Sequence, residues 1–347
     1  MELYLHIGTN KTASSFLQTL MVTNAKLLAQ CGYYIPTSKY DDEMKRGSIT
    51  PGNGADLAWA IHDKNVNSIK QILTKSFVEA KGEGLDKVLI SNEIIVRLFS
   101  DKDCLDSFSQ SVKELNITKV KLIVFVRDLL GHSRSLYLHR SKSGDNFDIQ
   151  NWFETDYETL SLTDQFLKLY KQYNFEFSFA SFNSNTLVTN FFDVFLEVDS
   201  KSLQIPNLSV NKSLGLNETR VLQTAKILSR LNTHLLYSKL LKLDTTANEE
   251  LEKQFKVEAA SYFKNHIKTI QFIEDEIGFK ISEKIDFNQA DLSSNSKPTI
   301  YLTEEHLNVI KQSQYSYLTS LLHDFRTKLK PKSNKFNTKR YGGNLRP

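Results

Sequence analysis

The order of apolar and polar positions predicts a chain in which short strands alternate with helices. Five runs are short, rich in apolar residues and bounded by turn residues, as expected for strands of a buried parallel sheet. They are residues 3–7, 33–35, 87–91, 122–126 and 176–181. Helical spacing of apolar residues marks the stretches 16–31, 55–81, 103–115 and 162–173. This alternation predicts the α/β class, with helices on both faces of a central parallel sheet.

After about residue 217 the pattern becomes almost wholly helical. We expect a helix capped by Asn217, a long charged helical region over 248–279, and a last helix capped by Thr303. The chain therefore reads as one α/β domain over 1–325 with a C-terminal helical supplement. Residues 326–347 hold eight Lys or Arg and no acidic residue, which predicts a basic, disordered tail.

Composition is typical of a folded globular protein, with 40% hydrophobic and 24% charged residues in a chain of 347. The net charge of +4 comes from the tail, because the rest of the chain has 36 basic against 40 acidic residues, a net charge of −4. This segregation argues against a dedicated nucleic-acid binder. The sequence has no apolar run long enough for a membrane span and no signal peptide before the first strand, so we expect a cytoplasmic protein.

The first strand leads into a loop with the side chains of an anion-binding site. The segment HIGTNKTASSFLQ passes from an apolar run through Gly8 and Lys11 into a helical pattern. Backbone N–H groups and the positive end of a helix dipole meet at such a turn, and Lys11 would add a full charge. Hydroxyl donors would come from Thr12, Ser14 and Ser15. The loop lacks the Gly-Lys-Ser/Thr string of ATP-binding loops, so a triphosphate with magnesium is not favoured.

A second anion-binding feature follows the fourth strand, in the segment VFVRDLLGHSRSLYLH. Arg127 ends the strand, and its planar guanidinium suits a bidentate contact with phosphate. Ser135 follows eight residues later, and the two could reach one phosphate if the chain turns at Gly131. Because the carboxyl ends of parallel strands share one edge of a sheet, Lys11, Arg127 and Glu93 should meet there.

These motifs, in this order and with the segment KVLISNE, resemble those of sulfotransferases that use 3′-phosphoadenosine-5′-phosphosulfate (PAPS), especially bacterial members that act on carbohydrates. The resemblance implies a three-layer α/β/α fold with a central parallel sheet like that of P-loop NTPases. It implies that the 5′-phosphosulfate is held by Lys11, Thr12, Ala13, Ser14 and Ser15. It also implies that Arg127 and Ser135 hold the 3′-phosphate. Ala13 stands where the family usually has Gly, and Leu129 stands where Pro commonly follows Arg-Asp.

The implied reaction transfers a sulfuryl group from PAPS to a hydroxyl or amine of an acceptor, a carbohydrate or glycoconjugate, and releases 3′-phosphoadenosine-5′-phosphate (PAP). Such an in-line transfer depends on positioning and on neutralising the leaving group, a role that suits Lys11. It needs no metal, and the eight His and two Cys show no ligand-like spacing. The competing interpretations are a magnesium-dependent P-loop kinase and a non-catalytic nucleotide- or polyanion-binding protein that uses the basic tail.

The acceptor would need a base, and Glu93 is the first candidate. Glu93 follows a buried strand, where partial desolvation raises the pKa of a carboxyl, and it matches the Glu of the family's Ser-Glu element. His139 and His132 are competitors, whereas His6 interrupts a buried strand and reads as a core histidine. Asn211 and Ser213 of the segment VNKS are further candidates for nucleotide or acceptor contacts.

Overall fold

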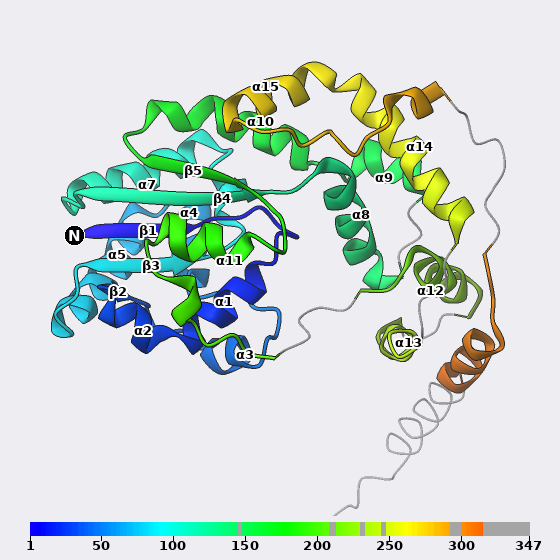
Figure 1. Ribbon diagram of the computed structural model, residues 1–347, viewed down its shortest axis with the longest axis horizontal. Coiled ribbons are helices and arrows are strands. Elements are labelled where there is room, and N and C mark those ends of the chain that lie inside the picture. The colour runs from blue at the N-terminus through cyan, green and yellow to red at the C-terminus, as the bar shows by residue number, and fades with distance from the viewer. Residues whose placement is uncertain (145–147, 208–212, 230–232, 244–247, 292–299, 315–347) are drawn as a thin grey trace, which may run out of the picture.

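The computed structural model describes the chain except for residues 145–147, 208–212, 230–232, 244–247, 292–299 and 315–347. At its centre, five strands run parallel to their neighbours in the order β2-β3-β1-β4-β5 (Figure 1). The strands are β1 Glu2–His6, β2 Tyr33–Tyr34, β3 Lys87–Ser91, β4 Lys119–Val126 and β5 Glu176–Ser181. All five predicted strands are confirmed, and β3 and β5 have the predicted bounds.

Helices cover both faces of this sheet, so the predicted three-layer α/β/α architecture is confirmed (Figure 1). Successive residues of a strand point to opposite faces. In β1, Leu3 and Leu5 enter one apolar core and Tyr4 enters the other. The first core includes residues of α4 Ala55–His62, α5 Val66–Gly82, α6 Ile95–Leu98, α7 Lys102–Glu114, α8 Leu129–Arg140, α9 Ile149–Thr155, α10 Thr159–Leu169, α14 Glu249–Asn265 and α15 Ile267–Ile277. The second includes residues of α1 Ser14–Thr23, α2 Ala25–Gln30, α11 Leu187–Thr189 and the π-helical segment Asn190–Phe195.

Several helices that the pattern predicts as continuous are divided. The helix expected over 16–31 breaks at Asn24, whose side-chain amide donates to the Leu20 carbonyl and to the Gln204 carbonyl of a distant segment. The helix expected over 55–81 breaks between α4 and α5, where the backbone is left-handed. The segment before α4 contains the short helix α3 Asp41–Lys45. Side-chain contacts and single backbone angles set these breaks, and apolar periodicity does not report them.

The helical supplement forms a small apolar cluster of its own, built by α12 Leu216–Ser229, α13 Thr233–Leu240 and the helix over 304–314. Thr303 caps the last helix as predicted, since its hydroxyl accepts from the His306 N–H at 3.2 Å. The predicted cap Asn217 is wrong, because α12 begins one residue earlier. The Asn217 side chain instead forms hydrogen bonds with the backbone carbonyl and N–H of Tyr301, at 2.8 and 2.9 Å. The basic tail lies outside the described residues.

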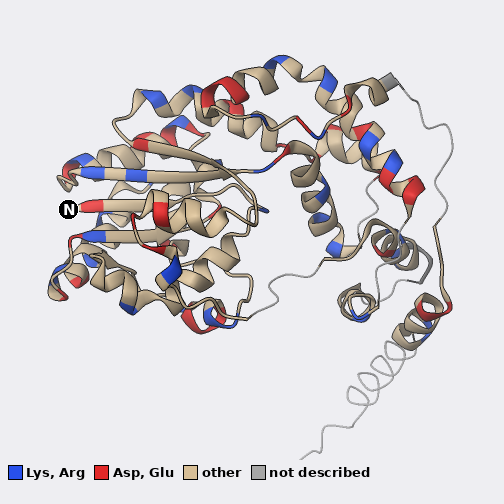
Figure 2. Ribbon diagram, in the orientation of Figure 1, with Lys and Arg blue, Asp and Glu red and all other residues tan. Residues whose placement is uncertain are grey.

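Charged residues are spread over the outer helices, and α8 carries basic residues without an acidic one (Figure 2). This helix starts directly after β4, and the Asp128 carboxylate caps it by accepting from the Gly131 N–H at 2.7 Å. The chain therefore turns at Asp128, and the expected turn at Gly131 is wrong because Gly131 is already helical.

Within the described ranges, no helix is long and apolar enough to cross a membrane.

Candidate functional site

The loop between β1 and α1 is fixed against the neighbouring strand before it turns. Thr9 N–H donates to the Phe125 carbonyl at 2.9 Å, and Phe125 N–H donates to the Gly8 carbonyl at 2.8 Å. Gly8 has φ +132, and a Cβ there would lie 2.7 Å from Val96 Cγ1, so only glycine fits. The Thr12 hydroxyl is fully buried and donates to the Thr9 carbonyl. Thr12 thus shapes the loop from within and does not line the cavity described below.

The turn of this loop presents a row of backbone donors. Lys11 and Ala13 both have left-handed backbones, with φ 63 and φ 60, so alternate residues turn neighbouring N–H groups toward a common side. The N–H groups of residues 10–15 donate to no described residue. Those of Ser14 and Ser15 are free because they belong to the first turn of α1. A concave row of free donors at a helix N-terminus favours an anion.

A cavity of about 320 Å³, here called the loop cavity, opens against this row. The predicted site residues that line it are Lys11, Ala13, Ser14, Ser15, Glu93 and His139. They come from the loop, from the segment after β3 and from α8, so three distant segments meet there. Asn10, Arg97 and Arg140 also line the loop cavity, and the sequence pattern did not single them out.

Positive charge is crowded around the loop cavity. Burial lowers the pKa of Lys11, the Lys142 charge lowers it further, and Glu93 opposes both effects. Burial, followed by the charges of Lys11, Lys142 and Arg140, lowers the pKa of His139 to about 4, so His139 is neutral at neutral pH. Because these groups disfavour one another's protonation, a bound anion would relieve their repulsion.

Glu93 provides an acidic group on the same cavity wall. Burial raises the pKa of its carboxyl, as its place after a buried strand predicted, while the nearby Ser14 hydroxyl and the Lys11 charge counteract part of that rise. The Ser14 hydroxyl is itself buried and makes no hydrogen bond of ordinary geometry with the described residues. A carboxyl with a raised pKa beside a cation has the properties of a general base.

Two of the candidate histidines have other roles. His132 supports the loop from α8, with Nε2 3.1 Å from the Asn10 carbonyl and Nδ1 3.2 Å from the Tyr157 hydroxyl. His6 is fully buried in the core, with Nδ1 2.9 Å from the Ser91 hydroxyl, as the pattern predicted. Burial lowers the pKa of each to about 4. Neither imidazole lines the loop cavity.

Arg127 links the end of β4 to the loop. Its Nη1 donates to the Lys11 carbonyl at 3.2 Å, and its guanidinium lies 5.2 Å from the centre of the Phe182 ring. The buried Nε has no partner among the described residues. This Nε would lie 3.1 Å from a Cβ at Gly131, so the side chain lies against the first turn of α8. Ser135 follows Gly131 by one turn on the same side of the helix.

Arg127 lines a second cavity, of about 430 Å³, and not the loop cavity. Lys280 and Lys284 contribute to its wall, and sequence reasoning missed both. Each lysine has an acidic partner: Lys280 lies 2.7 Å from Glu274, and Lys284 lies 3.1 Å from Asp128. Nothing in the local pattern distinguishes these lysines from others in the lysine-rich C-terminal half, because only the fold brings them to Arg127.

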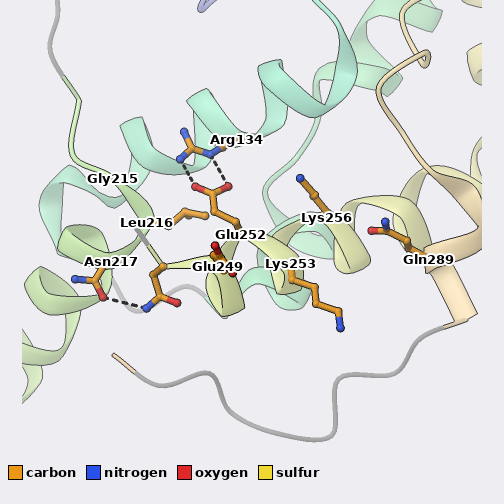
Figure 3. A pocket seen from close by; sticks show the side chains of 10 residues that line it. Arg134, Gly215, Leu216, Asn217, Glu249, Glu252, Lys253, Lys256 and Gln289 are labelled. Carbon is orange, nitrogen blue, oxygen red and sulfur yellow. Dashed lines mark hydrogen bonds and ion pairs between the residues drawn. The ribbon is translucent and has the colours of Figure 1, made fainter. Parts of the chain in front are cut away.

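A third cavity, of about 560 Å³, lies between α8, α12 and α14 (Figure 3). Arg134 faces it and makes a two-pronged ion pair with Glu252. Leu136 lines the loop cavity, and the spacing of two residues between Arg134 and Leu136 places their side chains on opposite sides of the helix.

The predicted residue Ser213 is exposed and lines none of the three cavities, and Asn211 lies outside the described residues.

Within the part of the chain that the structure describes, no three His, Cys, Asp or Glu side chains are grouped so that they could hold a metal ion.

In comparisons with known proteins, the chain matches no protein-family model, no curated protein and no solved structure. The fold and the site define an α/β protein with a five-stranded parallel sheet. At the carboxyl edge of that sheet, a cationic cavity adjoins a row of free backbone donors.

Proposed function

We propose that this protein is a PAPS-dependent sulfotransferase that acts on a hydroxyl or amine of a carbohydrate-like acceptor. The observation that carries the proposal is the hydrogen bond from Arg127 to the Lys11 carbonyl. It places a guanidinium with a free Nε directly beside the row of free N–H groups. A nucleotide with an anionic group at each end has a partner for both features, whereas ADP has a partner for only one.

In the proposed complex the 5′-phosphosulfate lies on the N–H row, and the 3′-phosphate is bound by Arg127 and Ser135. The acceptor oxygen forms a bond to sulfur while the bond from sulfur to the phosphate oxygen breaks, and PAP leaves. Lys11 stabilises the negative charge that develops on that oxygen. Glu93 takes the proton of the acceptor hydroxyl. His139, with a pKa of about 4, is a weaker base than a carboxyl whose pKa is raised.

Titration calorimetry with PAP, ADP and ATP tests the donor site. We expect PAP to bind at least about tenfold more tightly than ADP, because a charged hydrogen-bonded contact contributes roughly 1.5–3 kcal/mol. Arg127→Ala should remove most of this preference. Lys81→Ala is the control, since it removes the same charge from an exposed position of α5, which lines none of these cavities, and it should preserve the preference.

Equal affinities for PAP and ADP would contradict the proposal, and so would a preference that survives Arg127→Ala. Tight binding of ATP that depends on magnesium would favour the P-loop kinase instead.

A further inference from the structure

A narrow recess adjoins the loop cavity beside α8. The recess has a volume of about 50 Å³, and its walls come from the loop, α6, α8, α10 and the segment before α10. Asn10, Arg97, Leu136 and Arg140 line both spaces, so the two are direct neighbours. Arg127 lines neither of them, which separates the recess from the proposed 3′-phosphate site. The recess therefore offers space for an acceptor beside the loop cavity that the proposed donor does not occupy.

Two arginines stand where the loop cavity meets the recess, and one of them is neutralised. Arg97 Nη2 lies 2.9 Å from Glu158 Oε2, in an ion pair at the wall of the recess. The Arg140 guanidinium makes no ion pair or hydrogen bond with any described side chain. Its charge is felt inside the loop cavity, since it contributes to the low pKa of His139. Among the described side chains Arg140 thus has no ion-pair partner, although Asp156 also lines the recess.

We propose that Arg140 binds a carboxylate of the acceptor, so that the preferred acceptors are hydroxyl-rich carboxylic acids of the uronic-acid type. This inference rests on the proposed function, because the donor already accounts for Lys11 and Arg127. The guanidinium fork matches a carboxylate in two parallel hydrogen bonds. Thr159 and Thr163 offer hydroxyls farther along the recess, and Leu136 offers an apolar surface for the C–H face of a sugar ring.

A pair of acceptors that differ in one group tests the assignment. Transfer of labelled sulfate from PAPS is measured to 4-nitrophenyl β-D-glucuronide and to 4-nitrophenyl β-D-glucoside, which has a hydroxymethyl group in place of the carboxylate. The wild-type protein should favour the glucuronide by about tenfold or more in kcat/KM, the effect expected of one charged bidentate contact. In Arg140→Ala this ratio should fall toward one, and in Arg140→Glu it should invert. Arg134→Ala, on the opposite side of the same helix, should keep the wild-type ratio.

The result is separable from the donor assignment because PAP binding is measured on the same proteins. A wild-type ratio of one or less, a ratio unchanged in Arg140→Ala, or no transfer to either acceptor with intact PAP binding would overturn the role of Arg140 and leave the donor site standing. Loss of the preference for PAP over ADP in the wild-type protein would instead overturn the proposed function.

Discussion

The φ angle of Ala13 sets both the strain in the loop and the direction of its N–H groups. Its φ of 60 lies in the left-handed region, where a Cβ costs about 1–2 kcal/mol. The same angle turns the following N–H groups toward the loop cavity, so the unfavourable conformation and the free donor row arise together. The sequence of the loop identified Ala13 as an unusual residue at a position that favours glycine. Its left-handed φ agrees with that preference, because glycine adopts this conformation without strain.

Replacing Ala13 by glycine should therefore stabilise the protein slightly. Relief of the left-handed strain outweighs the added entropy of the unfolded chain by about 0.5 kcal/mol. Ala29→Gly within α2 is the control, and it should lower the free energy of unfolding by about 1 kcal/mol. Urea denaturation of both variants checks the difference. A loss of stability in Ala13→Gly equal to that in Ala29→Gly would show that Ala13 is unstrained.

Glu93 should leave a signature in the pH dependence of stability. Its pKa is raised in the folded protein, mainly by burial, so protonated Glu93 favours folding. The stabilisation that a raised pKa gives is complete below the unfolded pKa and is lost as the pH rises through the folded pKa. Glu93→Gln should therefore gain stability relative to the wild type as the pH rises above the ordinary pKa of a glutamate, while losing transfer activity.

Denaturation measured over this rise in pH, with Glu114→Gln as the control, checks the prediction for Glu93. The Glu114 carboxyl pairs with Lys70, which lowers its pKa, so its replacement should bring no such gain at high pH. A stability difference for Glu93→Gln that does not change with pH would mean that the Glu93 carboxyl is not perturbed by folding.

Among the secondary-structure elements, Asn217 in α12 joins the N-cap of α14 and the segment before the last helix, which are distant in sequence. Its Oδ1 accepts from the Tyr301 N–H and from the Asn248 side-chain amide, and its Nδ2 donates to the Tyr301 carbonyl. Asn217→Ala would leave buried polar groups unpaired and should cost about 2–3 kcal/mol of stability. Asn308→Ala, at an exposed position of the last helix, should change it by less than about 0.5 kcal/mol. Equal urea midpoints for the two variants would contradict this role.

β3 was predictable because a strand buried on both faces is a continuous apolar run between polar turns. β5, at the edge of the sheet, was predictable from its alternating Phe177 and Phe179, whereas the helix break at Asn24 was missed. That break depends on a hydrogen bond to Gln204, which is 180 residues away, and no local pattern contains it. Asn217 failed as a predicted cap for the same reason, since its partners are Tyr301 and Asn248.

The candidate site was predictable where it depends on strand order. Lys11, Glu93 and Arg127 each follow a strand, so a parallel sheet brings them to one edge. The inward hydroxyl of Thr12 was not predictable, because the hydroxyl direction depends on the backbone angles of the loop. Arg140 was missed because nothing in the local pattern distinguishes it from other basic residues, and only the fold brings it to the loop cavity.

In the whole molecule, the central position of β1 organises the site. β1 lies between β3 and β4, so the segments that follow these three strands are direct neighbours. The helical supplement then contacts the far end of α8. Lys226 donates to the Ser143 carbonyl at 3.0 Å, and the Lys142 ammonium lies 5.6 Å from the centre of the Tyr237 ring. The supplement thereby holds Lys142 in the group of charges around the loop cavity.

The basic charge is concentrated in residues 326–347, and this leads to a prediction about deletion of that tail. All contacts that define the proposed donor site lie before residue 285, so deletion of 326–347 should change PAP affinity by less than about twofold at physiological salt. Calorimetry with the full and shortened chains measures this, with Lys11→Ala in the full chain as a control that should weaken binding. If the tail were the binding element of a polyanion-binding protein, its deletion would abolish PAP binding while Lys11→Ala would have little effect.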